Sequence, residues 1–378
     1  MMATLQNMLE MNDGSFAKAE AMAKKFIAEG NLEEWLDLAM LCHAQGKLEE
    51  TRKCHLEYAK HFPDCPRNKF SAAWLMLHDG DLQGGLEHIE AGRSIGTLGQ
   101  TSFGNPTNLG VPQLTGVRWD GKADIKGKTV LLFCEAGIGD QMMNVRAVNW
   151  LSELGAKVVV SCSPSLMSLF SRMKNVAAVV SIESKEVYHD FYILALSSTR
   201  LCKRTWENLW SGSYLGAKPS EIWDRIIPKG FNIGLRWKGL PTFEHQQLRI
   251  FPPEKLFDAV QSTKAKFWSL QKEDRETQLP EYITNLEPLL GDWDQTATAI
   301  TRMDLIITSD TAVGHLAGAM GKKTWIIVPA MPYWPWARPG PKTSWYPSVT
   351  LYRQRCYGNW DEPFEEIRQA LQKEEFLK

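Results

Sequence analysis

The residues best suited to bind a phosphate lie in a strand-turn-helix segment in the last third of the sequence. An apolar segment, 304–308, is typical of a strand, and Ser309-Asp310-Thr311 follows it with a carboxylate and two hydroxyls. Small residues dominate the next segment, 311–320, which predicts a helix, and a second strand is predicted over 324–328. Such a turn suits a ligand that carries both phosphate and hydroxyl groups.

Each residue of this turn has a candidate role. The backbone N–H groups of Thr311, Ala312 and Val313 would point toward an anion at the positive end of the helix dipole. Asp310 is a good helix N-cap, a role that does not exclude ligand binding. His315, one turn inside the helix, fits a packed core histidine and a ligand contact equally well.

A group of cations forms a second candidate site. Arg236 and Lys238 lie at the carboxyl end of the strand predicted over 232–237, and Arg249 follows after a polar loop. Cations that converge at a strand end suit a diphosphate, because a guanidinium can bind two oxygens at once. The alternative is a solvated loop with exposed charges.

A glycine turn after an earlier strand provides a candidate general base. Gly137 and Gly139 suggest a dinucleotide fingerprint, but Met142 occupies the place of its third glycine, so we exclude an NAD site. The turn would present Asp140 at the carboxyl edge of the sheet, where ligands of such folds bind. Asp140 could then act as a general base, with Glu135 as a weaker candidate, or it could only cap the following helix.

Two further patterns argue against a metal. Asp292-Trp293-Asp294 has the Asp-x-Asp form of some metal sites, but it opens a predicted helix, 293–302, and we interpret it as a cap. The seven cysteines are scattered and lack a Cys-x-x-Cys pair, which disfavours both a zinc site and a disulfide framework. We therefore expect no metal and no cofactor.

Alternating strands and helices should position these residues. After a Gly- and Pro-rich segment, 97–128, which we interpret as a linker, strands are predicted at 130–134, 157–161, 177–181 and 191–194. The pattern restarts after Gly230, with strands at 232–237, 267–270, 305–308, 324–328 and 349–352. Helices are predicted at 144–154, 253–261, 293–302, 311–320 and 363–371. This alternation predicts two doubly wound parallel sheets, in domains 129–228 and 229–378.

The first 96 residues are helical in pattern. Gly46 and Gly80 lie 34 residues apart, each before a Leu two positions on, which is the period of tetratricopeptide repeats. Trp35 and the small residues around it fit the same repeat. Because about two and a half repeats are near the minimum that stacks stably, we expect this array, 1–96, to pack against the next domain.

Composition restricts the class of protein. The 378 residues carry a net charge of −1, which favours neither a nucleic acid nor a membrane surface as partner. Neither a signal peptide nor a membrane span is evident, and we expect a cytoplasmic location. Of the 15 tryptophans, Trp334, Trp336 and Trp345 lie in a Pro-rich loop, where they could pack the core or stack on a base or a sugar.

Taken together, several blocks resemble the heptosyltransferase-type glycosyltransferases, glycosyltransferase family 9, in the variety preceded by tetratricopeptide repeats. The resemblance extends from about Arg118 to the end of the chain. The blocks that carry it are 135–140, 234–239, 269–271, and above all 309–321 with 334–336 and 344–347.

The resemblance implies a GT-B fold, in which two Rossmann-like domains face a cleft, and metal-independent transfer with inversion. Asp140 matches the catalytic base, Arg249 a cation at the donor phosphates, and Asp310 the carboxylate that contacts the donor sugar. The backbone of 311–313 matches the segment that holds the diphosphate. Other donor-side candidates are Arg236, Lys238, Gln271 and His315, and the acceptor-side candidates are Gly137, Gly139 and Arg146.

Our hypothesis from the sequence is a glycosyltransferase that moves a sugar from a nucleotide-diphosphate sugar to an acceptor hydroxyl. The helical repeats would recruit a protein or glycan acceptor. The alternatives are an inactive scaffold whose repeats bind a partner, and a nucleotide-sugar epimerase, which would not need such an array. The presence of Asp140, Arg249 and Asp310 together favours the transferase.

Overall fold

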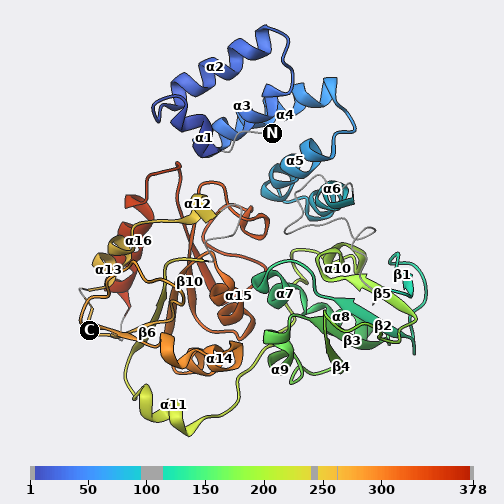
Figure 1. Cartoon of the computed structure of the whole chain (residues 1–378), viewed down its shortest axis with the longest axis vertical. Helices are drawn as coiled ribbons and strands as arrows, with labels where there is room; N and C mark the ends of the chain where they lie inside the picture. Colours follow the sequence, from blue (N-terminus) through green and yellow to red (C-terminus); the bar gives the residue numbers. More distant parts are fainter. Residues whose placement is uncertain (1–4, 95–113, 240–245, 262, 375–378) are drawn as a thin grey trace.

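The computed structural model describes residues 5–94, 114–239, 246–261 and 263–374. Figure 1 shows a group of N-terminal helices above two α/β units that lie side by side. Residues 97–113 of the segment interpreted as a linker, 97–128, lie outside the described residues. The boundaries predicted at 96, 128 and 228 stay predictions.

In the part of the chain that the structure describes, six helices precede the sheets. They are α1 (Leu5–Glu10), α2 (Phe16–Ala28), α3 (Glu34–Ala44), α4 (Leu48–His61), α5 (Pro66–His78) and α6 (Leu82–Ser94). Gly46 and Gly80 follow α3 and α5 with φ of +74° and +97°, a left-handed conformation that glycine adopts without steric cost. Helices α3 and α5 thus each end just before one of the two glycines that mark the 34-residue spacing, while the assignment of the helices as tetratricopeptide repeats stays a prediction.

The helical array packs against both α/β units, as expected for so short an array. Leu77 and Leu86 are buried in the same apolar cluster as the strands of the first unit. Trp206 Nε1 donates to the Gly80 carbonyl at 2.7 Å, and Tyr357 of the second unit donates its N–H to the Ala44 carbonyl at 2.8 Å. The array is therefore hydrogen-bonded to both α/β units.

The first unit contains a five-stranded parallel sheet. Its strands are β1 (Val117–Arg118), β2 (Thr129–Phe133), β3 (Lys157–Cys162), β4 (Val176–Ser181) and β5 (Phe191–Leu194), in the order β1-β5-β2-β3-β4. Its helical segments are α7 (Ile138–Asn144), α8 (Ala147–Glu153), η1 (Pro164–Leu166), α9 (Met167–Phe170), η2 (Ala195–Ser197), α10 (Ser198–Leu201) and α11 (Glu221–Ile226). Strand β1 falls inside the segment interpreted as a linker. Its two residues pair with β5, so this part of the segment belongs to the sheet.

The second unit contains a six-stranded parallel sheet. Its strands are β6 (Asn232–Arg236), β7 (Lys266–Ser269), β8 (Ile283–Asn285), β9 (Leu305–Ser309), β10 (Thr324–Val328) and β11 (Val349–Arg353), in the order β11-β10-β9-β6-β7-β8. Its helical segments are α12 (Gln246–Arg249), α13 (Pro253–Val260), η3 (Glu287–Leu289), α14 (Trp293–Thr301), α15 (Ala312–Ala319), η4 (Trp334–Trp336) and α16 (Asp361–Lys373). The first strand, β6, is central and the strand order reverses between β6 and β9, which is the Rossmann order.

One predicted helix was wrong. The segment 144–154 is not one helix but the end of α7 and the whole of α8. The reason is tertiary: Arg146 Nε donates to the Met143 carbonyl at 2.7 Å, and Tyr214 Oη donates to the Met142 carbonyl at 3.0 Å. Side chains therefore satisfy carbonyls that a continued helix would have used.

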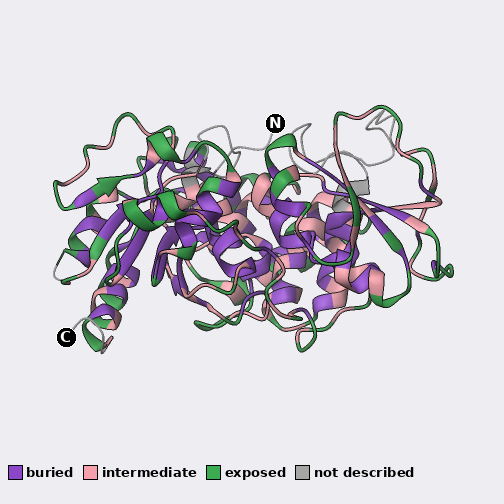
Figure 2. Cartoon of the chain, turned by 90° about the horizontal axis from the view of Figure 1, so that it is seen from below, coloured by how far each residue is buried: buried purple, intermediate pink, exposed green. Residues whose placement is uncertain are grey.

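The two units share one apolar core. Buried side chains run without interruption from β2 through α7 and α8 to α15 and the loop at 334–346. Figure 2 shows the buried residues concentrated in the strands and in the helices between the units. A second cluster packs α13 and α16 against the other face of the six-stranded sheet. No helix within the described ranges combines the length and apolarity that crossing a bilayer requires.

Candidate active site

Sheet topology brings the predicted turns together. In doubly wound sheets, ligands bind at the carboxyl ends of the strands where the strand order reverses. In the first sheet this position follows β2, where Gly137 and Asp140 lie, and in the second it follows β6 and β9, where Arg236 and Asp310 lie. Arg236 is paired with Thr308 in the β6–β9 register, so the two strand ends are adjacent.

Helices α7 and α15 join the two turns by direct contact (Figure 1). A Cβ placed on Gly139 would lie 2.9 Å from the His315 ring and 3.3 Å from the Ala312 Cα. Because real Cβ atoms essentially never come within 3.0 Å of another heavy atom, a side chain at position 139 would force the His315 ring or the helix to move. The glycine turn thus serves a close approach between units, a role that the sequence did not reveal.

Asp140 lies at this contact, half-buried in the first turn of α7. Its Oδ2 accepts the Gly137 N–H at 3.0 Å, and its Oδ1 accepts a hydrogen bond from the Tyr333 hydroxyl of the second unit. Burial raises the pKa of Asp140 to about 6, helped by the nearby carboxylates of Asp310 and Glu135, although the two hydrogen bonds act in the opposite direction. The N-cap of α7 is Gly137, so the prediction that Asp140 caps the following helix was wrong in position: Asp140 lies inside the first turn and accepts the N–H of the N-cap residue. Its other oxygen faces the second unit.

Asp310 is buried at the end of β9, and it is not the N-cap of α15 that its position suggested. The N-cap is Thr311, whose side chain forms no capping bond, while the Asp310 Oδ1 accepts the Trp336 Nε1–H at 2.9 Å. Burial raises the pKa of Asp310, and the positive charge of Arg249 limits this rise. The Arg249 guanidinium also donates to the Asp310 carbonyl.

Two guanidinium groups converge near these carboxylates. Burial lowers the pKa of Arg249, and the carboxylates of Asp310 and Asp140 oppose that shift, so all three groups lie within electrostatic reach of one another. Burial, followed by repulsion from Arg249, lowers the pKa of Arg236 to about 10. Two cations that repel each other in a partly buried site favour an anionic ligand between them.

The amino end of α15 adds backbone donors to this site. The first N–H groups of a helix have no intrahelical acceptors, and here they belong to Thr311, Ala312 and Val313. Ser309, 1% exposed, has a buried hydroxyl without a hydrogen-bond partner. These groups lie beside Asp310, so carboxylate, hydroxyl and N–H groups share one strand end.

Three predicted residues are bound to protein groups instead. Lys238 pairs with Glu276 at 3.3 Å and Asp274 at 3.7 Å. The buried Gln271 accepts the Lys238 N–H at 3.0 Å and donates to the Lys272 carbonyl at 2.9 Å, so it fixes the turn after β6. Glu135 accepts the N–H groups of residues 195 and 196 at 2.8 and 3.2 Å.

Arg146 is 1% exposed and connects the two units. Its guanidinium donates to the Leu209 carbonyl at 3.3 Å in the first unit and to the Trp345 carbonyl at 3.0 Å in the second. It also lies 4.8 Å from the centroid of the Tyr346 ring and 4.9 Å from that of Tyr214. The structure therefore places this acceptor-side candidate in a closed aromatic cage.

His315 is packed in the core. Its Nδ1 lies 3.1 Å from the Tyr346 hydroxyl, and its ring stacks on Trp336 with centroids 5.2 Å apart. Burial lowers the pKa of His315 to about 3, so the ring is neutral at physiological pH. Trp334, Trp336 and Trp345 are all buried, which agrees with packing.

Tyr333 is the residue of this site that the sequence did not single out. It precedes η4 in the Pro-rich loop, and only the approach of the two units brings its hydroxyl to Asp140. The sequence signal was indirect: the Trp-Pro-Trp segment that follows it belongs to a block of the family resemblance.

The Asp-x-Asp segment behaves as the sequence indicated. Asp292 caps α14 by accepting the Gln295 N–H at 2.8 Å, and Asp294 forms an ion pair with Arg172 of the first unit. Arg172 pairing holds the pKa of Asp294 below its usual value. Within the described ranges, no group of three or more His, Cys, Asp or Glu side chains is arranged to hold a metal ion.

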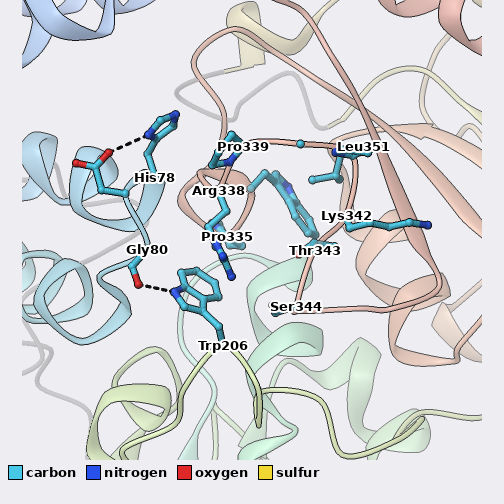
Figure 3. A pocket seen from close by; sticks show the side chains of 14 residues that line it. His78, Gly80, Trp206, Pro335, Arg338, Pro339, Lys342, Thr343, Ser344 and Leu351 are labelled. Atoms are coloured by element: carbon cyan, nitrogen blue, oxygen red, sulfur yellow. Dashed lines mark hydrogen bonds and ion pairs between the residues drawn. The ribbon is translucent and has the colours of Figure 1, made fainter.

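A cavity of about 540 Å³ lies where the helical array meets both units. Figure 3 shows His78 and Gly80 from the α5–α6 turn on one wall, Trp206 of the first unit below them, and Arg338 from the Pro-rich loop opposite. Trp336, which holds Asp310, also lines this cavity. The side chain of Trp336 thus lies between the cavity and Asp310 of the candidate active site.

No family model matches the chain. Protein FlbA of Caulobacter vibrioides is 25% identical over 360 residues, which cover 83% of this chain and 57% of that protein. The chain therefore spans little more than half the length of that relative.

Several solved structures are similar in part. The ADP-heptose LPS heptosyltransferase II of E. coli has 14% identity and a TM-score of 0.45, covering 65% of this chain and 99% of that one. A glycosyl transferase family 9 protein of Veillonella parvula has 11% identity and a TM-score of 0.44, covering 66% and 98%. The dodecameric iron-containing glycosyltransferase TibC of E. coli has 10% identity and a TM-score of 0.45, covering 64% and 67%.

At these identities and TM-scores the similarities assign no activity to this chain. The two doubly wound parallel sheets, with the carboxyl ends of their strands brought together, have the arrangement of a GT-B-like α/β fold.

Proposed function

We propose that this protein is an inverting glycosyltransferase that uses a nucleoside-diphosphate sugar and needs no metal ion. Asp140 takes the proton from an acceptor hydroxyl as that hydroxyl attacks the anomeric carbon. The bond to the diphosphate breaks on the opposite side, and the nucleoside diphosphate leaves with an added negative charge.

The supporting observation is the electrostatic grouping of Asp140, Arg249 and Asp310 across the two units. A base with a pKa of about 6 is ionised at neutral pH and still accepts a proton readily. Arg236, Arg249 and the amino end of α15 would stabilise the charge that develops on the leaving group, which is the electrostatic role that a metal ion has in other transferases. Asp310 would accept hydrogen bonds from donor-sugar hydroxyls.

The proposal is tested by nucleoside diphosphate release from UDP-, GDP- and ADP-linked sugars, with EDTA present in one arm. One donor should give release that EDTA does not reduce, and the product should have the inverted anomeric configuration by NMR. Asp140→Asn should lower the rate about 10²- to 10⁴-fold, as the loss of a general base does. Asp258→Asn, an exposed carboxylate on α13, is the matched control.

Binding of the nucleotide is measured in the same variants by thermal shift. Asp140→Asn should retain the stabilisation that the matching nucleotide gives to the wild type. Tight nucleotide binding by the wild type with no release from any donor would instead support the inactive scaffold.

We further propose that the helical array recruits the acceptor. The cavity shown in Figure 3 supports this idea, because the α5–α6 turn and the loop that holds Asp310 through Trp336 both line it. His78 and Lys342 line opposite walls of this cavity. Their replacement with Ala should lower sugar transfer to proteins of a cell extract at least several-fold. Donor hydrolysis by water should be unchanged, and an equal loss of both activities would contradict recruitment through this cavity.

A further inference from the structure

The two oxygens of Asp140 have different partners, and one partner comes from the opposite unit. Oδ2 accepts the Gly137 N–H of its own turn at 3.0 Å. Oδ1 accepts a hydrogen bond from the hydroxyl of Tyr333, which belongs to the loop between β10 and η4 of the second unit. The oxygen that faces the second unit is therefore occupied by a hydroxyl group of the protein itself.

A general base in sugar transfer must accept the same kind of bond. The acceptor hydroxyl has to donate to a carboxylate oxygen of the base before its proton can move. Because Oδ2 is held by the Asp140 turn, Oδ1 is the oxygen through which an acceptor from outside would bind. The Tyr333 hydroxyl thus donates to the carboxylate oxygen that an acceptor hydroxyl would use.

We propose that Tyr333 is a gate on the catalytic base, whose hydroxyl occupies Asp140 Oδ1 until an acceptor hydroxyl displaces it. This inference rests on the proposed glycosyl transfer. Such a gate would protect the donor. Without it, an ionised carboxylate beside a bound nucleotide sugar would activate water, which would hydrolyse the bond between sugar and diphosphate. While Tyr333 donates to Oδ1, its hydroxyl competes with water for the oxygen that would take the proton.

The surroundings of both groups agree with a neutral phenol that donates. Burial and the negative charge of Asp140 raise the pKa of Tyr333 well above its ordinary value, so its hydroxyl keeps its proton at physiological pH. The charged groups that act on Asp140 are Glu135 from its own turn, Asp310 from the end of β9 and Arg249 from α12, while the neutral His315 lies beside the turn on α15. Tyr333 is the hydroxyl among the hydrogen-bond partners described for Asp140.

The test compares Tyr333→Phe with the wild type in the full-length chain. Phenylalanine keeps the ring, which packs against Trp334 with centroids 5.6 Å apart, and removes only the hydroxyl. The matched control is Tyr282→Phe, which removes a hydroxyl that donates to the Phe257 carbonyl at 3.0 Å elsewhere in the second unit.

With the matching nucleotide sugar and no acceptor, Tyr333→Phe should release nucleoside diphosphate several-fold faster than the wild type and the control. Its acid limb should also move to higher pH, because the lost hydrogen bond favoured the ionised carboxylate. Hydrolysis no faster than in the wild type would overturn the gate. Intact-mass measurement should find the wild-type protein unmodified after incubation with donor, and a sugar attached to Tyr333 would make it an acceptor instead and also overturn the gate.

The failure of this inference can be told apart from the failure of the proposed function. A wild type that releases no nucleoside diphosphate from any donor contradicts the proposed function and the gate with it. A wild type that does release it, together with a Tyr333→Phe variant that hydrolyses no faster, contradicts the gate alone. NMR titration of the Asp140 carboxyl in ¹³C-aspartate-labelled protein, assigned with Asp140→Asn, checks the hydrogen bond directly: its midpoint should rise in Tyr333→Phe.

Discussion

Burial of the Asp140 carboxyl has two consequences: the ionised carboxylate destabilises the folded protein, and its raised pKa suits a general base. Its pKa of about 6 lies above the value near 3.8 of an unfolded chain, so the folded protein binds this proton more tightly. Stability from this group is fully present below pH 4 and is lost as the pH rises through 6. A base that costs stability when ionised is the kind of group that function retains.

At the residue scale, the first prediction is therefore a pair of opposite pH effects. The transfer rate should fall as the pH drops below about 6, because the base becomes protonated. Asp140→Asn should be more stable than the wild type by about 1 kcal/mol at pH 8, after a discount for the partial exposure of this side chain, and the difference should vanish near pH 4. Urea unfolding at both pH values measures it, with Asp258→Asn as the control that stays constant. An acid limb near pH 4 would contradict the raised pKa.

Individual residues could be predicted where strand ends fix them, and not where distant parts of the chain do. Asp140 and Asp310 follow apolar strands and Arg236 ends one, so their position at a sheet edge was readable from the pattern. Lys238 has its carboxylate partners more than 30 residues away in sequence, and the aromatic cage of Arg146 is more distant still. Whether a charged residue faces a ligand or a protein partner is decided by such contacts.

At the element scale, the contact between α7 and α15 depends on the glycine at position 139, which has no side chain. Gly139→Ala would place a Cβ 2.9 Å from the His315 ring and 3.3 Å from the Ala312 backbone, which has little freedom to move. We expect the helices to separate, with a loss of about 1–3 kcal/mol in the free energy of unfolding, as overpacking usually costs. Transfer should fall as well, because the same contact holds Asp140 near Arg249.

Gly291→Ala is the control for this variant, since nothing lies within 4 Å of a Cβ placed there. Urea unfolding and the rate of nucleoside diphosphate release measure both effects. A Gly139→Ala protein as stable and active as this control would mean that the two helices tolerate a wider separation.

Elements with a strong apolar pattern were predicted well. The strands β5 and β10 have the predicted bounds. Five others, β3, β4, β6, β9 and β11, differ by one residue at one end, and β2 and β7 are each shifted by one residue. Strand β8 was missed because it has three residues, of which only Ile283 is buried, so it has no apolar run. The break between α7 and α8 was missed because the Arg146 side chain causes it, through a contact that propensity does not contain.

At the scale of the whole molecule, the two units are joined by a chain of side-chain contacts that leads to the candidate donor site. Arg146 of the first unit lies over Tyr346, and the Tyr346 hydroxyl bonds His315. His315 stacks on Trp336, whose Nε1 donates to Asp310. The sequence predicted two facing sheets, but the aromatic residues that fix their separation come from loops whose packing has no periodic signal.

The last prediction follows from this chain of contacts. Arg146→Met keeps the length of the side chain but removes donors to the carbonyls of Met143, Leu209 and Trp345, all in a buried site. Because buried acceptors left unpaired cost about 1–3 kcal/mol each before relaxation, we expect the free energy of unfolding to fall by about 2–4 kcal/mol. Arg355→Met, whose side chain is 73% exposed, should change it by less than about 0.5 kcal/mol.

The same variant also tests whether the chain of contacts serves the donor site. At a temperature where Arg146→Met remains folded, loosening of Tyr346 and His315 should free Trp336 and thereby Asp310, so KM for the donor sugar should rise more than kcat falls. The KM for the acceptor should stay near the wild-type value, because Asp140 keeps its own partners, Gly137 and Tyr333. A loss of stability with both KM values unchanged would restrict Arg146 to holding the two units together and would remove its link to Asp310.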